Sequence, residues 1–223
     1  MTPAIRAVVF DFDGLVLDTE TPVYTSWSEA FAAHGAPLTL EEWLAEVGSE
    51  GVLDLMSMLH DRATRAVDVD AMHATRRARR DELLAHETLL PGVEQWLDDA
   101  RRAGLGIAIA SSSPLDWVHG HLTRLGVRDR FGHVSCRDEE VRAKPAPDVY
   151  LRACEALGVE PPDALAVEDS ANGVAAAKAA GLWCVAVPNR ITAGLDFGTA
   201  DLVLDSLADC SLADALRRLD ARL

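Results

Sequence analysis

Short apolar segments recur along this chain, and helix-length amphipathic stretches separate the later ones. They are rich in Val, Ile and Ala and lie around residues 5–10, 105–110, 164–167, 183–187 and 201–204. Runs of this length and composition are typical of strands that are buried on both faces of a sheet. Their alternation with helices predicts an α/β fold with a mostly parallel sheet and helices on both faces.

Residues 19–88 do not follow this alternation. Their apolar side chains recur at helical spacing, as at Trp27 and Phe31, and they suggest no convincing strand. We therefore expect a small helical bundle inserted after the first strand, and an α/β core formed by residues 1–18 and 89–223. A bundle inserted at this point would sit over the carboxyl ends of the strands and could act as a lid.

The chain is acidic, with a formal net charge of −15 over 223 residues. Binding to nucleic acid or to an anionic membrane depends on a positive surface, so we expect neither as a partner. No apolar run is long enough to cross a bilayer, and the first residues lack a signal-peptide pattern. The four cysteines are widely spaced, as in a protein with reduced thiols. We expect a cytoplasmic monomer.

The first predicted strand ends in two carboxylates, because residues 5–10 lead directly into Asp11-Phe12-Asp13-Gly14. Open α/β sheets build ligand sites at the carboxyl ends of their strands. Two carboxylates this close repel each other unless a cation lies between them, and a hard divalent cation such as Mg²⁺ suits oxygen ligands. The alternative is a turn at Asp13-Gly14, with Asp11 as a solvated strand end.

A second apolar strand ends in the hydroxyl side chains of Ser111-Ser112-Ser113, just before Pro114. The free backbone N–H groups of a helix start, with a serine hydroxyl beside them, can bind an anion. Alternatively, Ser113 is simply the N-cap of the next helix, with Pro114 at the first helical position.

Two later segments also carry charge. Lys144 precedes the proline-stiffened residues 145–147, where a lysine could neutralise a phosphoryl oxygen and a neighbouring carboxylate. Another apolar strand runs into Glu168-Asp169-Ser170, and this further carboxylate pair would suit Mg²⁺. The alternatives are a solvated lysine and helix capping by Asp169 or Ser170.

In their order along the chain, these four segments resemble the motif set of the haloacid dehalogenase-like hydrolase superfamily, over residues 8–187. The insertion, and the phrase DFDGLVLDTE at residues 11–20, resemble the branch that includes beta-phosphoglucomutase-like and phosphoglycolate phosphatase-like enzymes. The resemblance implies a Rossmann-like core, a helical cap at residues 19–88, and a Mg²⁺-dependent phosphatase that forms an aspartyl-phosphate intermediate.

The resemblance also implies roles for individual residues. Asp11 would be the nucleophile that attacks phosphorus. Asp13 would protonate the leaving oxygen and then deprotonate the hydrolytic water. Ser111, Ser112 and Lys144 would bind the transferring phosphoryl group. The Mg²⁺ ligands would be the Asp11 side chain, the Asp13 backbone carbonyl, Asp169 and Glu168.

The resemblance leaves a sugar phosphomutase as an alternative function. Such a mutase would be expected to carry a cap histidine shortly after Thr19 and an arginine in a loop between cap helices. This chain has ETPVY at residues 20–24 and VGSEG at residues 47–51. Without a cap cation to hold a second phosphate, water is the favoured acceptor. We therefore predict a phosphatase for a small phosphorylated metabolite, such as a sugar phosphate or nucleoside monophosphate.

Two further functions are less compatible with the sequence. Dehalogenation is disfavoured because the superfamily's dehalogenases lack the acid found here at Asp13. A non-catalytic phosphometabolite-binding protein is disfavoured because the motifs are intact.

The densest positive charge, RRARR at residues 76–80, suggests a solvated helix face. The functional alternative is that Arg76, Arg77 or Arg80 contacts the leaving group of the substrate.

Overall fold

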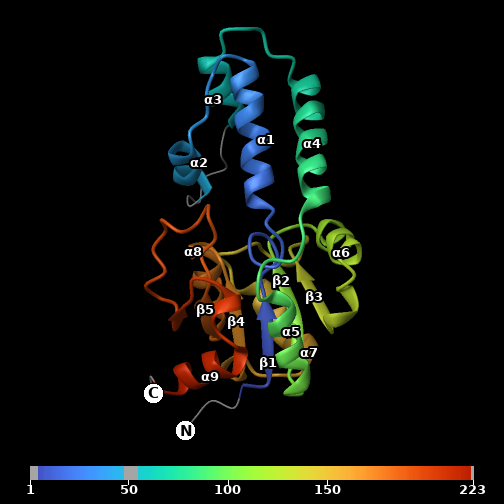
Figure 1. The fold of residues 1–223 in the computed structure, drawn as a ribbon, viewed down its shortest axis with the longest axis vertical. Coiled ribbons are helices and arrows are strands. Elements are labelled where there is room, and N and C mark those ends of the chain that lie inside the picture. The colour runs from blue at the N-terminus through green and yellow to red at the C-terminus, as the bar shows by residue number, and fades with distance from the viewer. Residues whose placement is uncertain (1–4, 48–54, 222–223) are drawn as a thin grey trace. The chain divides into compact units, whose positions relative to one another are not determined.

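The computed structural model describes residues 5–47 and 55–221 (Figure 1). The chain divides into two compact units. One is formed by Met1–Leu17 and Thr88–Leu223, and the other is Asp18–Glu87. We call them the α/β unit and the helical unit. Each boundary lies one residue before the position that the sequence suggests.

The α/β unit contains a six-stranded parallel sheet with the order β3-β2-β1-β4-β5-β6. The strands are β1 (Ala7–Phe10), β2 (Gly106–Ser111), β3 (His133–Cys136), β4 (Ala164–Glu168), β5 (Trp183–Ala186) and β6 (Leu202–Val203). This sheet confirms the predicted α/β fold. Strand β3 was not predicted, because its sequence HVSC contains a single aliphatic residue.

Helices cover both faces of this sheet. They are α5 (Val93–Arg102), α6 (Leu115–Arg124), α7 (Asp148–Leu157), α8 (Ala171–Ala180) and α9 (Leu212–Asp220), with short 3₁₀ turns at Arg128–Arg130, Pro161–Asp163 and Leu207–Asp209. Helices α7 and α8 share one buried cluster with the sheet. Helices α5 and α9 pack on the opposite face (Figure 1).

The two faces of the sheet differ in side-chain size. The face under α7 and α8 carries small residues, namely Ala7, Ala108, Ala110, Ala164, Ala166 and Ala186. The other face carries larger ones, namely Val8, Phe10, Ile107, Ile109, Leu165 and Val167. Because side chains alternate along a strand, the rows Ala7, Val9, Asp11 and Ala164, Ala166, Glu168 continue on the alanine-rich face. The fold thereby directs two carboxylates toward α7 and α8.

The helical unit consists of α1 (Glu20–Ala33), α2 (Leu40–Val47), α3 (Leu55–Arg62) and α4 (Val69–His86). Helices α1 and α4 pack along each other, and Arg79 of α4 forms an ion pair with Glu29 of α1 at 2.9 Å. Where the chain leaves and rejoins the α/β unit, an isolated antiparallel bridge pairs Leu17 with Leu89. Within the two described ranges, no helix combines the length and apolar character needed to cross a membrane.

Candidate active site

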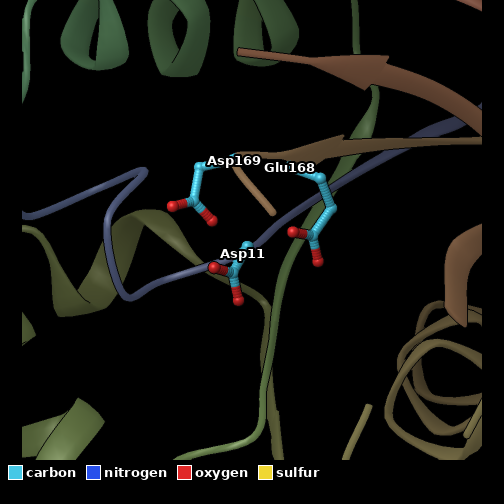
Figure 2. Close-up of side chains that lie close together, drawn as sticks. All are labelled: Asp11, Glu168 and Asp169. Carbon is cyan, nitrogen blue, oxygen red and sulfur yellow. The ribbon is translucent and has the colours of Figure 1, made fainter. Parts of the chain in front are cut away.

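Three buried carboxylates meet at the carboxyl ends of β1 and β4. Asp11 follows β1, Glu168 ends β4, and Asp169 comes next; one carboxylate oxygen from each lies within 4.8 Å of those of the other two. Figure 2 shows the three side chains gathered around one point. The backbone N–H of Asp11 donates to the Val167 carbonyl at 2.9 Å, which extends the strand pairing to this residue. The sheet itself therefore fixes the spacing of the carboxylates.

Lys144 lies between two of these carboxylates. Its Nζ donates to Asp11 Oδ1 and, at 2.6 Å, to Glu168 Oε1, and its side chain is only 6% exposed. The backbone N–H of Lys144 donates to Ser112 Oγ at 3.1 Å, which ties the lysine to the segment after β2. The structure thus brings Lys144 to the carboxylates instead of leaving it solvated.

Glu168 is held on several sides. Tyr150 of α7 donates its hydroxyl to Glu168 Oε1 at 2.5 Å, and Ser170 Oγ donates to Oε2 at 3.2 Å. A Cβ atom at Gly173 would lie 1.9 Å from Glu168 Oε2, so only glycine fits there. Ser170 also caps α8 by accepting from the Gly173 N–H at 3.1 Å, as the capping alternative predicted for this residue.

The charges of the site are unbalanced without a further cation. Burial raises the pKa of Asp11 to about 8; Lys144 opposes this shift, and Glu168 and Asp13 add to it. Burial disfavours the charged form of Lys144, but attraction to Asp11 and Glu168 outweighs it and raises the lysine pKa. One lysine contacts only two of the three carboxylates, and this oxygen-rich, buried set fits a hard divalent cation.

Asp13 is anchored by the end of β2 and by the residues that follow it, up to the first turn of α6. Its Oδ2 accepts from Ser113 Oγ at 2.7 Å and Ser111 Oγ at 3.2 Å, and its Oδ1 accepts from the indole N–H of Trp117 at 2.9 Å. The N-cap interpretation of Ser113 is wrong, because α6 begins at Leu115 with Pro114 at the N-cap position. The Ser113 hydroxyl contacts Asp13 instead.

The seven core residues named from the sequence therefore form one connected group: Asp11, Asp13, Ser111, Ser112, Lys144, Glu168 and Asp169. Sequence reasoning missed Tyr150, Trp117, Ser113 as an Asp13 partner, and Asn189, which donates to Asp169 Oδ2 at 2.6 Å. An aromatic or amide side chain gives no pattern of its own. Ser113 and Asn189 follow strand ends, which could have pointed to them, whereas Tyr150 and Trp117 lie within helices.

The three arginines that the sequence suggested for substrate contact lie on α4 in different surroundings. The Arg76 guanidinium lies 4.5 Å above the Trp27 ring centroid, and its Nε is buried without a hydrogen-bond partner among the described residues. Arg80 pairs with Asp81 at 2.6 Å, and Arg77 is exposed. Of the loop at residues 47–51, positions 48–51 fall outside the described residues.

Comparison with known proteins decides the family. A family model described as haloacid dehalogenase-like hydrolase matches residues 5–181. The chain belongs to this family. It is an enzyme of the phosphatase type, as its relatives indicate. The protein named "Putative phosphatase YhcW" from Bacillus subtilis (strain 168) is 40% identical over 218 residues, which cover 98% of this chain and 99% of that protein.

Two other relatives represent the range of this haloacid dehalogenase-like family. The crystal structure of a CbbY variant from Rhodobacter sphaeroides in complex with xylulose-(1,5)bisphosphate is 31% identical, covers 94% of this chain and 98% of its own, and superposes with a TM-score of 0.76. Beta-phosphoglucomutase from Bacillus subtilis (strain 168) is 29% identical over 215 residues, covering 93% of this chain and 92% of that enzyme. The family thus includes both hydrolases and a mutase.

Proposed function

We propose that this enzyme is a Mg²⁺-dependent phosphatase that hydrolyses a small phosphorylated metabolite through an aspartyl-phosphate. The observation that supports this best is that two carboxylates are held in different ways. Lys144 holds Asp11, whereas Asp13 accepts from Ser111 at the end of β2, Ser113, and Trp117 of α6. A carboxylate nucleophile and a separate acid and base are the two groups that this reaction requires.

The cation would be held by Asp11, Asp169, the Asp13 backbone carbonyl and Glu168. When bound, Mg²⁺ would offset the negative charge of the carboxylates and of the phosphoryl oxygens. Glu168 already accepts from Lys144 and Tyr150, so its second role is to keep the lysine in place.

In the first step, Asp11 attacks phosphorus and the bond to the leaving oxygen breaks, while Asp13 gives that oxygen a proton. In the second step, Asp13 takes a proton from water, which attacks phosphorus and releases phosphate and free Asp11. Ser111, the Ser112 segment and Lys144 bind the phosphoryl oxygens throughout, because donors directed at developing charge stabilise it.

We further propose that the helical unit is a cap that excludes water until transfer is complete. Among its arginines, Arg76 is the best candidate for substrate recognition, ahead of Arg77 and Arg80, since its buried Nε retains an unused donor among the described residues. Sugar phosphates and nucleoside monophosphates are the proposed substrate class, and the sugar bisphosphate in the CbbY complex supports the former.

A panel of phosphorylated metabolites, assayed for phosphate release with Mg²⁺ and with a chelator, tests the proposal. We expect release that needs Mg²⁺ and that falls at least a thousandfold in Asp11→Asn, since the variant lacks the nucleophile. Unchanged turnover in Asp11→Asn would refute the nucleophile assignment. Isomerisation of a sugar phosphate that needs a bisphosphate activator, with little phosphate release, would instead identify a mutase.

A further inference from the structure

Asn189 connects two parts of the site that are distant in sequence. It lies in the loop after β5, three residues beyond Ala186. Its side-chain nitrogen Nδ2 donates to Asp169 Oδ2 at 2.6 Å and to the Gly14 carbonyl oxygen at 3.0 Å. One amide group therefore joins the end of β4 to the loop that follows β1.

The loop that contains Asn189 fixes the orientation of this amide. The side-chain oxygen Oδ1 accepts from the backbone N–H groups of Ile191 at 2.8 Å and Thr192 at 3.0 Å. The backbone N–H of Asn189 donates to Thr192 Oγ1 at 3.0 Å, and Thr192 is buried. Because the oxygen end faces two donors, the NH₂ end is the one that must face Asp169.

Close packing leaves Asp169 little freedom. Gly14 has φ +80°, and a Cβ atom on it would lie 2.3 Å from Asp169 Oδ2 and 2.6 Å from Asn189 Nδ2. The backbone of Gly14 thus contacts both groups directly. Movement of the amide would remove one hydrogen bond from the Asp169 carboxylate and one from the β1 loop.

We propose that Asn189 is a positioning residue of the metal site, holding the Asp169 carboxylate in the orientation that it shares with Asp11 and Glu168. This inference rests on the proposed Mg²⁺ dependence. Partners that hydrogen-bond a ligating carboxylate fix its direction, and their loss typically weakens metal binding about 10- to 100-fold. A neutral amide suits this position because it donates to a carboxylate without placing a positive charge beside the proposed cation.

Two variants of the full chain separate this role from a purely structural one. Asn189→Ser keeps a short oxygen acceptor for the turn but cannot reach Asp169. Thr192→Val is the matched control, since it removes the acceptor of the Asn189 backbone N–H and leaves the amide in place. Mg²⁺ alone, without substrate, is titrated into each protein by calorimetry, and each unfolding midpoint is recorded.

We expect Asn189→Ser to raise the Mg²⁺ Kd about tenfold or more, and Thr192→Val to keep it within about twofold of the wild type while lowering the unfolding midpoint. A wild-type Kd in Asn189→Ser overturns the inference. An equal rise in both variants also overturns it, because the integrity of the turn would then explain the effect. If the wild type itself binds no Mg²⁺, the proposed metal dependence fails, and the positioning role fails with it.

Discussion

At the scale of single residues, the most constrained group is the Glu168 carboxylate. It is fully buried and accepts from Lys144, Tyr150 and Ser170. A buried carboxylate is stable only when hydrogen-bond donors or cations replace its hydration. Burial, followed by the charge of Glu168, raises the pKa of Tyr150 well above its usual value, so the phenol stays protonated and donates.

Replacing Tyr150 by Phe tests this arrangement. The variant leaves Glu168 without one donor, so we expect the free energy of unfolding to fall by about 1.5–3 kcal/mol. We also expect lower phosphatase activity, because Glu168, the partner of Lys144, is then held less firmly. Tyr24→Phe is the matched control: its hydroxyl makes a long 3.4 Å bond to the Leu38 carbonyl. Urea unfolding of both variants measures the difference, and equal losses would contradict the special role of Tyr150.

The buried thiols give a second prediction at this scale. Burial, with a smaller effect of Glu160, raises the pKa of Cys154 to about 11, whereas a free thiol titrates near 8.5. The unfolded chain therefore loses this proton first, and the contribution of Cys154 to stability falls as pH rises above about 8.5. At pH 9 we expect iodoacetamide to leave Cys154 unmodified in the native protein and to modify it in urea. Rapid native modification, located by mass spectrometry, would contradict this.

At the scale of elements, close contact between α8 and β4 depends on the absence of a side chain. Gly173 lies in the first turn of α8, directly against the Glu168 carboxylate, and the sheet below carries Ala164 and Ala166. Small residues at these positions let the helix approach the strand end. The N-terminus of α8 consequently lies beside the carboxylate pair.

Gly173→Ala is expected to destabilise the protein by about 1–3 kcal/mol, because the added carbon overlaps a buried charged group, and to lower activity by displacing Glu168. Gly120→Ala in α6 is the matched control. In the described part of the chain, nothing lies within 4 Å of a Cβ atom at Gly120. Alanine there should therefore raise the free energy of unfolding by about 0.5–1 kcal/mol through its higher helix propensity. Chemical denaturation measures the change in the free energy of unfolding for both variants. An unchanged free energy in Gly173→Ala would contradict the close approach of α8 to Glu168.

At the scale of the whole molecule, folding brings together the ends of β1, β2 and β4 and the segment around Lys144. An ion that binds only this assembled site stabilises the entire fold. At a Mg²⁺ concentration 100 times the Kd, we expect about 2.7 kcal/mol of added stability. Thermal melts with Mg²⁺ and with a chelator measure it. Asp169→Asn should lose most of the gain, and the same gain in that variant would contradict the site.

The sequence by itself determined the α/β class, the helical insertion and the strand-end motifs, because these depend on local periodicity and on helix boundaries. The prolines and glycines around α5 and α7, for example, mark helix starts and stops through their own backbone preferences. Only the tertiary structure decided that Ser113 and Trp117 hold Asp13, that Tyr150 holds Glu168, and that Asn189 reaches Asp169. These contacts join residues distant along the chain, and their geometry depends on strand order and on helix packing, which no local pattern encodes.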